Sequence, residues 1–510
     1  MKFSTSTLTA AAVLLASGSA ADDTILGAFI FGRHGDRLTK PTTTLTTLGA
    51  HQLLNSGQFY HARYLDPESS LRIDGLNLTY HESQLSAQAP NGAVIQMSQW
   101  AFFQGLYPPL NTLKGLSAEI SETEVISLSE SLANGTDLDA PLEGYQYIVS
   151  QGVDDDAPDT IWIKGDENCP SFDASSQRYY QSSEFKALNA STYDFYQSLS
   201  GLVAGGLSKS KLNYANAYSV FDYINVNAIH NGTFAALISD DDFNRVKWLQ
   251  DRYTTDLNYN ASDSATVIGA KTLLAAMYTN LNATLVARKP LLSMFTGSYD
   301  TFSQFFGLTG LIDQDPQTFG GLVNYGASLV LELFKTDSDS TPRVRFLFRN
   351  GTETTDALTP YPIFGQDVAG IKFTDFEDLV NENAIHDLQG WCSACGAWKL
   401  DLCKPLAPTY EAFEELLADK NAELSSTVAS SDELAQSLRN ILGTDASSSS
   451  GGLTLAGAGG IGAGVTIAVF LIAGAVFLVC RKLLATGATK PPVTKTKMEN
   501  DDLSSTQSTV

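Results

Sequence analysis

"TILGAFIFGRHGDR", residues 24–37, joins a largely apolar run to a short turn that carries two arginines and one histidine. The first eight residues are mostly β-branched, aromatic or aliphatic, and their number suits a buried strand. Residues 46–65 follow the turn with apolar side chains at helical spacing. A strand, a turn and a helix in this order predict an α/β fold.

The turn brings Arg33, His34 and Arg37 together around Gly35. Arginine is the preferred partner of phosphate, because its planar fork binds two oxygens at once. A histidine between such cations can attack phosphorus and form a covalent phosphohistidine. The turn therefore predicts a phosphate pocket in which His34 is the nucleophile and Arg33 and Arg37 bind the phosphate. The alternative is a solvated surface turn with an ordinary loop histidine.

Residues 291–308 repeat the order of strand, turn and helix. Residues 92–109 predict a helix that ends at a proline, and residues 327–334 and 342–351 predict two further strands. The long stretch from about 113 to 289 is mostly helical and rich in loops. We therefore predict an α/β fold with a mixed sheet flanked by helices and an inserted, mainly α-helical cap.

Several ordered stretches together resemble the histidine acid phosphatase family, the phytase-containing branch of the histidine phosphatases. The resemblance runs from about Ala28 to Cys403 and implies that His34 forms the phosphohistidine. It also implies that Asp300 protonates the leaving group and that no metal or cofactor takes part. The stretches that carry it are "RHGDR" (33–37), "LTTLGAHQLLNSGQFYHARY" (45–64), "SQWAFFQGLYPP" (98–109), "CPSFD" (169–173) and the two late strands.

The sequence departs from the pattern of this family at three positions of the expected pocket. Gln88 and Val94 stand where further arginines are expected, and Tyr299 replaces the histidine of a His-Asp pair. Each lost charge-assisted donor typically costs about 2.7–4 kcal/mol of transition-state stabilisation. Tyr299 retains a hydroxyl that can donate to a phosphate oxygen, so we place it among the substrate-binding residues.

Three residues near these motifs leave alternatives open. Lys40 is either a replacement cation or an exposed turn lysine. Asp300 is either the proton donor or a helix N-cap, and the two roles are compatible. His386 and the aspartate after it form a second His-Asp dipeptide, but they follow the late strands instead of preceding them, so we interpret this dipeptide as unrelated to the site.

Charge and composition restrict the function further. The chain has 510 residues, a net charge of -24 and a hydrophobic content of 43%. Nucleic acid is excluded as a partner, because binding its phosphate backbone requires a basic surface. An acidic surface suits a protein that works in mildly acidic surroundings. A phosphate pocket in such a chain must be a local region of positive charge within an overall negative surface.

The two ends of the chain predict export and membrane anchoring. Residues 1–21 have the pattern of a signal peptide. Residues 461–480 are uncharged and long enough to cross a bilayer, and basic residues follow directly. We predict a single-pass type I membrane protein with an ectodomain over 22–425, a stalk over 426–460 and a cytoplasmic tail over 481–510. The predicted ectodomain has its α/β core over about 22–112 and 290–405 and its cap over about 113–289.

The cysteines and glycosylation acceptor motifs agree with export. Four cysteines in the ectodomain predict two disulfides with open pairing, and a metal or redox role for the Cys-x-x-Cys spacing is the weaker alternative. These cysteines are Cys169, Cys392, Cys395 and Cys403. The acceptor asparagines are Asn77, Asn134, Asn189, Asn231, Asn260, Asn282 and Asn350.

These observations predict a membrane-anchored extracellular acid phosphomonoesterase at the cell surface. A second hypothesis is a degenerate relative that binds phosphorylated or anionic ligands without turnover. A third and weaker one is a glycosylated structural protein of the cell wall. The identity of the substrate and the oligomeric state do not follow from the sequence.

Overall fold

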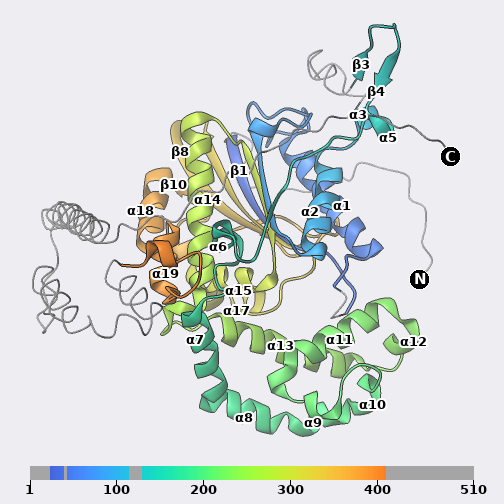
Figure 1. The fold of residues 1–510 in the computed structure, drawn as a ribbon, viewed down its shortest axis with the longest axis vertical. Helices are drawn as coiled ribbons and strands as arrows, with labels where there is room; N and C mark the ends of the chain where they lie inside the picture. The colour runs from blue at the N-terminus through green and yellow to red at the C-terminus, as the bar shows by residue number, and fades with distance from the viewer. Residues whose placement is uncertain (1–22, 40–42, 114–128, 409–510) are drawn as a thin grey trace, which may run out of the picture. The chain divides into compact units, whose positions relative to one another are not determined.

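The computed structural model describes residues 23–39, 43–113 and 129–408, and its centre is an eight-stranded mixed sheet (Figure 1). The strand order is β10-β8-β7-β1-β6-β2-β5, and β9 pairs with β8. β1 runs parallel to β6 and antiparallel to β7, and β2 runs parallel to β6 and β5. The strands are β1 (Asp23–Arg33), β2 (Leu85–Pro90), β5 (Gln151–Val153), β6 (Leu292–Gly297), β7 (Ser328–Thr336), β8 (Asp339–Arg349), β9 (Thr359–Tyr361) and β10 (Ile371–Lys372).

The sheet confirms the predicted α/β fold with a mixed sheet flanked by helices. The four predicted strands correspond to β1, β6, β7 and β8. β2 and β5 lie where we predicted no strand, because β2 is short and contains alanine, serine, glutamine and proline instead of β-branched residues.

Helices cover both faces of the sheet, which explains the almost continuous apolar character of β1. Ala28 and Ile30 share a core with α1 (Thr47–Tyr64) and α2 (Ala93–Leu106). Phe29 and Phe31 point to the other face and share a core with α14 (Ile268–Ala287) and α15 (Tyr299–Leu308). Successive side chains of a strand point to opposite faces, so a strand covered on both sides reads as one hydrophobic run.

A further layer of helices lies next to one end of the sheet (Figure 1). These helices have their own aromatic core, which includes Phe185, Tyr196, Tyr214 and Phe221. They fall within the range predicted as the cap, whereas α14, in the same range, packs against β1; the domain boundaries themselves stay predictions. The helices, called the helical layer below, are α7 (Pro170–Gln181), α8 (Ser183–Ser191), α9 (Tyr193–Ser198), α10 (Ser200–Val203), α11 (Ala217–His230), α12 (Gly232–Ala235) and α13 (Asp240–Asn258).

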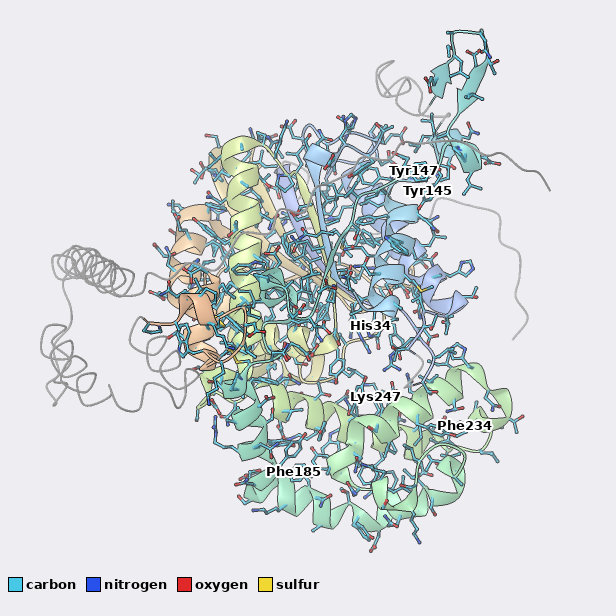
Figure 2. The ribbon with its side chains drawn as sticks, viewed as in Figure 1. His34, Tyr145, Tyr147, Phe185, Phe234 and Lys247 are labelled. Carbon is cyan, nitrogen blue, oxygen red and sulfur yellow. A yellow bond between two sulfur atoms is a disulfide. The ribbon has the colours of Figure 1, made fainter. Side chains whose placement is uncertain are left out.

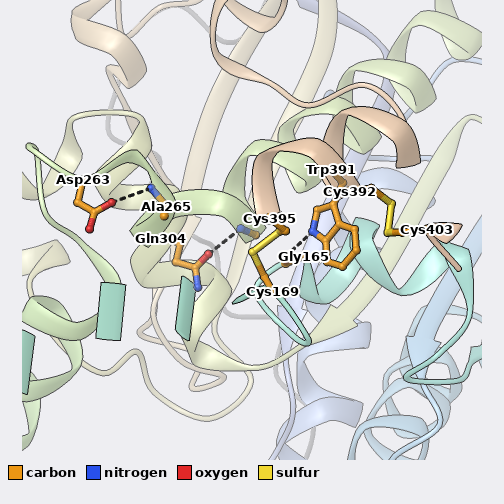
Figure 3. The surroundings of a disulfide bond; sticks show 10 residues. Gly165, Cys169, Asp263, Ala265, Gln304, Trp391, Cys392, Cys395 and Cys403 are labelled. Atoms are coloured by element: carbon orange, nitrogen blue, oxygen red, sulfur yellow. Dashed lines mark hydrogen bonds between the residues drawn. A yellow bond between two sulfur atoms is a disulfide. The ribbon is translucent and has the colours of Figure 1, made fainter. Parts of the chain in front are cut away.

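Two disulfides lie near the end of the described chain, and one of them joins that end to the start of the helical layer (Figure 3). Cys169, directly before α7, pairs with Cys395 at the end of α19 (Leu388–Cys395). Cys392 pairs with Cys403. Between them the buried Trp391 donates its indole N–H to the carbonyl oxygen of Gly165 at 2.6 Å. The pairing that the sequence left open is thereby assigned.

The predicted signal peptide, stalk, membrane span and tail lie outside the described residues. Within 23–39, 43–113 and 129–408, no helix is both long and apolar enough to cross a membrane. The span predicted over 461–480 therefore stays a prediction.

Candidate active site

The predicted catalytic turn lies at the carboxyl end of β1 and is buried. Arg33, His34 and Arg37 expose only 4%, 6% and 3% of their surface, so the solvated surface turn is the wrong alternative. A Cβ on Gly35 would come within 2.6 Å of the Leu53 side chain and 2.7 Å of the Gly49 carbonyl oxygen. Gly35 therefore allows the turn to pack closely on α1.

Arg33 lies between two tyrosine rings and keeps part of its hydrogen-bonding capacity. Its guanidinium carbon is 4.5 Å from the ring centre of Tyr325 and 5.6 Å from that of Tyr299, and Nη1 donates to the carbonyl oxygen of Val323. Its buried Nε has no acceptor within the described part of the chain. Burial lowers the pKa of Arg33, and Tyr325 and Tyr218 oppose that effect. Arg33 is thus a buried cation with an N–H that an anion can accept.

Arg37 is held by the helical layer. Nη2 donates to Asp222 Oδ1 at 2.8 Å and to the Tyr218 hydroxyl at 2.9 Å, and Nη1 donates to Asp222 Oδ2 at 3.2 Å. Burial lowers the pKa of Arg37, but Tyr218 and Asp222 outweigh it, so this pKa lies above the ordinary value. The bidentate face that a phosphate would use is occupied by a carboxylate of the protein itself.

The hydrogen bond of His34 defines which ring nitrogen can attack. Nδ1 lies 2.8 Å from the carbonyl oxygen of Gly35, which can only accept a proton. Nδ1 therefore carries the hydrogen in the neutral ring, and the lone pair lies on Nε2. In this tautomer Nε2 carries the lone pair that nucleophilic attack on phosphorus requires.

The remaining side chain of the turn also connects to the helical layer. Asp36 is fully buried, and its Oδ2 lies 2.7 Å from His230 Nε2 at the end of α11. Thr46, the N-cap of α1, donates to the same carboxylate. α11 therefore contacts the turn through three side chains, those of Tyr218, Asp222 and His230.

Tyr299 and Asp300 lie at the same edge of the sheet as His34. β1 and β6 are parallel neighbours with Arg33 opposite Gly297, and both strands end there. The N-cap position of α15 belongs to Ser298, so Asp300 lies in the first turn and is not the N-cap. Burial raises the pKa of Tyr299 well above its ordinary value, so its hydroxyl stays protonated and can donate a hydrogen bond.

Next to Asp300 lies a second carboxyl group, that of the buried Asp166. Burial raises the pKa of Asp166, and the charge of Asp300 raises it further. The protein thus holds two acidic side chains near the predicted leaving-group side, one buried and one half-buried.

The two positions where the resemblance predicts arginine carry neutral side chains. Val94 is buried one turn before Ser98, whose hydroxyl accepts from the backbone N–H of Gly35 at 3.0 Å. Gln88, on β2, donates to Gln151 on β5 at 3.1 Å. The structure therefore places Val94 near the turn without a charge that could bind phosphate.

Sequence reasoning missed the partners that the helical layer supplies. Tyr218 and Asp222 are four residues apart on α11, so they share one face of that helix. Tyr325 precedes β7 and packs beside His34 with 5.7 Å between ring centres. The spacing on α11 was visible in the sequence, but nothing in it indicated which helix would face the turn.

Other predicted residues lie elsewhere or outside the described chain. Asp387 is exposed and caps α19 by accepting from the N–H of Gly390 at 2.7 Å, which gives the second His-Asp dipeptide a structural role. Lys40 lies outside the described residues. No group of three or more histidine, cysteine, aspartate or glutamate side chains is placed to hold a metal in the described ranges.

The predicted glycosylation acceptors differ in exposure, and their modification stays a prediction. Asn134, Asn231, Asn260 and Asn350 are exposed, whereas Asn77, Asn189 and Asn282 are half-buried.

Comparison with known proteins gives one sequence match and several structural ones. Residues 25–349 match the sequence model of the histidine phosphatase superfamily (branch 2). None of the curated proteins compared with the chain matches it.

Among solved structures, the apo form of Hafnia alvei phytase aligns with a TM-score of 0.46 and 13% identity, over 74% of this chain and 99% of that one. Citrobacter braakii phytase aligns with a TM-score of 0.45 and 13% identity, over 73% and 99%. The Bifidobacterium longum multiple inositol polyphosphate phosphatase in complex with phosphate aligns with a TM-score of 0.42 and 14% identity, over 72% of this chain and 96% of that one.

Proposed function

Because this chain belongs to branch 2 of the histidine phosphatase superfamily, we propose that it hydrolyses a phosphate monoester through a phosphohistidine at His34. One observation carries the proposal. His34 follows the central strand β1 and lies between two buried arginines, one of which has a buried N–H without an acceptor in the described part of the chain. A buried cation with an unsatisfied donor, beside a histidine whose Nδ1 is held by a backbone carbonyl oxygen, suits a nucleophile facing a bound anion.

In the first step, Nε2 of His34 attacks phosphorus while the bond to the ester oxygen breaks. Arg33 binds the phosphoryl oxygens, where negative charge accumulates, and the Tyr299 hydroxyl donates to one of them. Asp300 gives its proton to the leaving alkoxide. In the second step, Asp300 takes a proton from water, the water oxygen attacks phosphorus, and the bond to Nε2 breaks. Phosphate leaves, and both residues regain their starting protonation states.

Arg37 supports this reaction mainly by holding the turn. Since Asp222 offsets its charge, we expect slower turnover than in a pocket where several free cations contact the phosphate. One missing charge-assisted donor corresponds to roughly 10²–10³ in rate.

We propose the cell surface as the location and an acidic medium as the working condition. A signal-peptide pattern at 1–21, an apolar run at 461–480 followed by basic residues and seven acceptor motifs support this proposal.

The test compares the purified wild-type protein with its His34→Ala variant on 4-nitrophenyl phosphate between about pH 3 and 7. Wild type should release nitrophenol and form an acid-labile phosphoprotein, and the variant should do neither. Asp300→Asn should still form the phosphoprotein from this ester, whose leaving group needs little protonation, but should hydrolyse it slowly. Equal rates for wild type and His34→Ala would reject the mechanism.

A second candidate function is anion binding without turnover. The pairing of Arg37 with Asp222 favours it, as does the neutral Val94 beside the turn. It predicts that inorganic phosphate raises the melting temperature of the protein while no ester is hydrolysed.

A further inference from the structure

A cavity of about 360 Å³ opens beside Arg33 and extends between the sheet edge and the helical layer. Arg33 and Tyr325 line its inner end, and Lys247 of α13 lies at the helical side. Figure 2 shows His34 at the end of the sheet and Lys247 on the side of the helical layer that faces it. A phosphate bound at Arg33 would therefore lie at the inner end of this cavity.

One wall of the cavity is apolar. Phe221 and Ile229 of α11 and Phe243 of α13 line it from the helical layer. Leu322 and Val323, from the loop before β7, line it from the sheet. Such a wall binds an apolar group by removing its surface from water.

The charged residues of the lining do not favour a second phosphate. Asp222, Glu353 and Asp356 contribute three carboxylates. Beyond Arg33, Lys247 is the only lysine or arginine that the described residues contribute to the lining, and its Nζ is already 2.6 Å from Asp251 Oδ2. A polyphosphorylated ligand would meet net negative charge there, because each of its phosphates needs its own cation.

Asp222 also reduces the charge at the phosphate position itself. Its two oxygens bind both terminal nitrogens of Arg37 at 2.8 and 3.2 Å, and only 11% of its side chain is exposed. Among the described residues of the turn, Arg33 is therefore the cation that remains for a ligand.

We propose that this cavity selects esters with a single phosphate on an uncharged, apolar alcohol, and that Asp222 and Glu353 exclude polyphosphorylated compounds. This inference rests on the proposed function for the position of the phosphate. It adds the class of substrate and two residues that determine it.

The test measures binding to the full-length His34→Ala protein by calorimetry, with phenyl phosphate, inorganic phosphate and myo-inositol hexakisphosphate as probes. Phenyl phosphate should bind about tenfold more tightly than inorganic phosphate, because the ring is buried against the apolar wall. The hexakisphosphate should bind no more tightly than inorganic phosphate. Tighter binding of the hexakisphosphate than of phenyl phosphate would overturn the proposal, as would absence of binding by all three probes.

Two variants assign the selectivity to the carboxylates. Glu353→Lys, on the exposed rim, should raise affinity for the hexakisphosphate about tenfold at low salt and leave phenyl phosphate unchanged. Glu382→Lys, on the exposed face of α18 (Phe373–Asn383), is the charge-matched control and should change neither. Asp222→Asn should raise affinity about tenfold for phenyl phosphate and inorganic phosphate and by a larger factor for the hexakisphosphate, because it releases the charge of Arg37 and also removes a negative charge from the lining. Equal responses to Glu353→Lys and Glu382→Lys would overturn the proposal.

Binding order and turnover separate this inference from the proposed function. A wild-type protein that hydrolyses no ester, while the variant binds in the expected order, would reject the proposed function alone. Hydrolysis through His34 with a preference for the hexakisphosphate would reject this inference alone.

Discussion

At the scale of single residues, the two arginines of the turn have different surroundings although they are only four positions apart. Arg33 has aromatic rings on both sides and a buried N–H without an acceptor in the described chain. Arg37 has its charge offset by Asp222. The local motif was sufficient to predict a buried cationic turn around His34. It was not sufficient to predict that Arg37 is paired with a carboxylate and that Arg33, among the described residues, is not, because Asp222, the partner of Arg37, lies on a helix about 185 positions further along the chain.

Tyr299 is the residue at which a single change should improve catalysis. Tyr299→His should raise kcat for phenyl phosphate about tenfold below about pH 6, because a protonated imidazole supplies the second cation that Arg37 does not. The gain should vanish as pH rises through the ordinary histidine pKa, near about 6.5. Steady-state kinetics of wild type and variant from about pH 4 to 8 measure this.

Tyr299→Phe is the matched control, since it removes the hydroxyl and adds no charge. It should lower kcat or leave it unchanged at every pH. If Tyr299→His and Tyr299→Phe behaved alike, the idea that the site lacks positive charge would be wrong.

At the scale of elements, strands with a strong apolar pattern were predictable and the polar one was not. β1, β6 and β7 are buried over most of their length and read as apolar runs, and β8 is buried mainly over residues 346–349. β2 lies beside β6, and two of its six residues are polar and only partly buried, so its sequence carries little hydrophobic signal. The site depends on β1 and β6, which explains why its location could be predicted before its surroundings.

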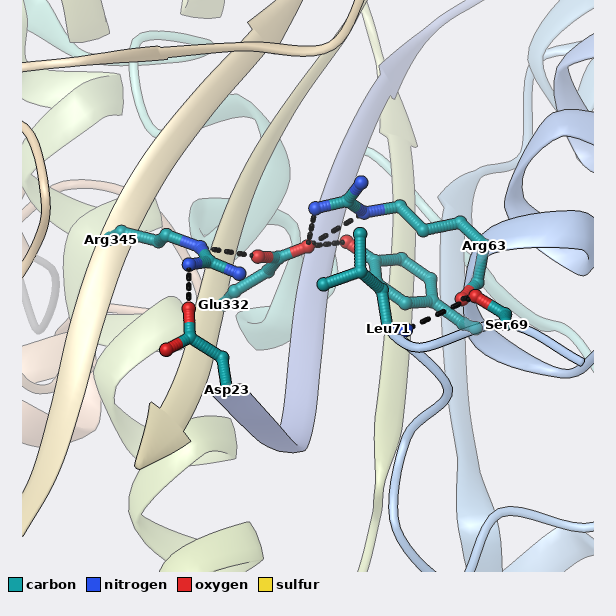
Figure 4. Close-up of polar contacts among 7 residues, drawn as sticks. Asp23, Arg63, Ser69, Leu71, Glu332 and Arg345 are labelled. Carbon is teal, nitrogen blue, oxygen red and sulfur yellow. Dashed lines mark hydrogen bonds and ion pairs between the residues drawn. The ribbon is translucent and has the colours of Figure 1, made fainter. Parts of the chain in front are cut away.

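A cluster of charged side chains connects the strands β1, β7 and β8 with the helix α1 (Figure 4). Glu332 of β7 is fully buried, and its carboxylate accepts from Arg63 and Tyr64 of α1 at 2.8 and 2.6 Å. Arg345 of β8 donates to the other oxygen at 2.6 Å and also to Asp23. Burial by itself would raise the pKa of Glu332, but Arg63 and Arg345 outweigh it and lower this pKa to about 2.

We expect Glu332 to make folding stability dependent on pH in the acidic range. Its folded-state pKa of about 2 lies below the ordinary value of 4.5, so the unfolded chain binds the proton more readily. The contribution is complete above pH 4.5 and is lost as pH falls toward 2. Glu332→Gln should therefore lower the free energy of unfolding by about 3 kcal/mol at pH 7 and flatten its dependence on pH below about 5.

Urea unfolding at several pH values measures this effect. Glu382→Gln removes an exposed glutamate from α18 and should change neither the stability at pH 7 nor the slope. A Glu332→Gln protein with wild-type stability and wild-type slope would contradict the role of the cluster.

At the scale of the whole molecule, the arrangement of distant segments is what the sequence could not supply. Four of the five cysteines were predicted to form two disulfides, but their pairing could be assigned only from the fold. The contact of α11 with the turn could not be predicted either, because no local sequence pattern specifies which helix packs against which turn. Both features connect the helical layer to the remainder of the described chain.

The two disulfides should stabilise the protein unequally. Cys169–Cys395 closes a loop with a sequence separation of 226, and Cys392–Cys403 one with a separation of 11. In the chain-entropy account, a disulfide restricts the unfolded chain more when its loop is longer, which gives about 5 kcal/mol for the first bond and about 3 kcal/mol for the second. All four cysteines are buried in one apolar cluster, so the loss of packing on substitution by serine is similar.

The double variant Cys169→Ser/Cys395→Ser should therefore unfold at a lower urea concentration than Cys392→Ser/Cys403→Ser, when both are compared with wild type at neutral pH. The reverse order would mean that the short bond stabilises the folded state locally around Trp391, and that the entropy of the unfolded chain is not the dominant effect.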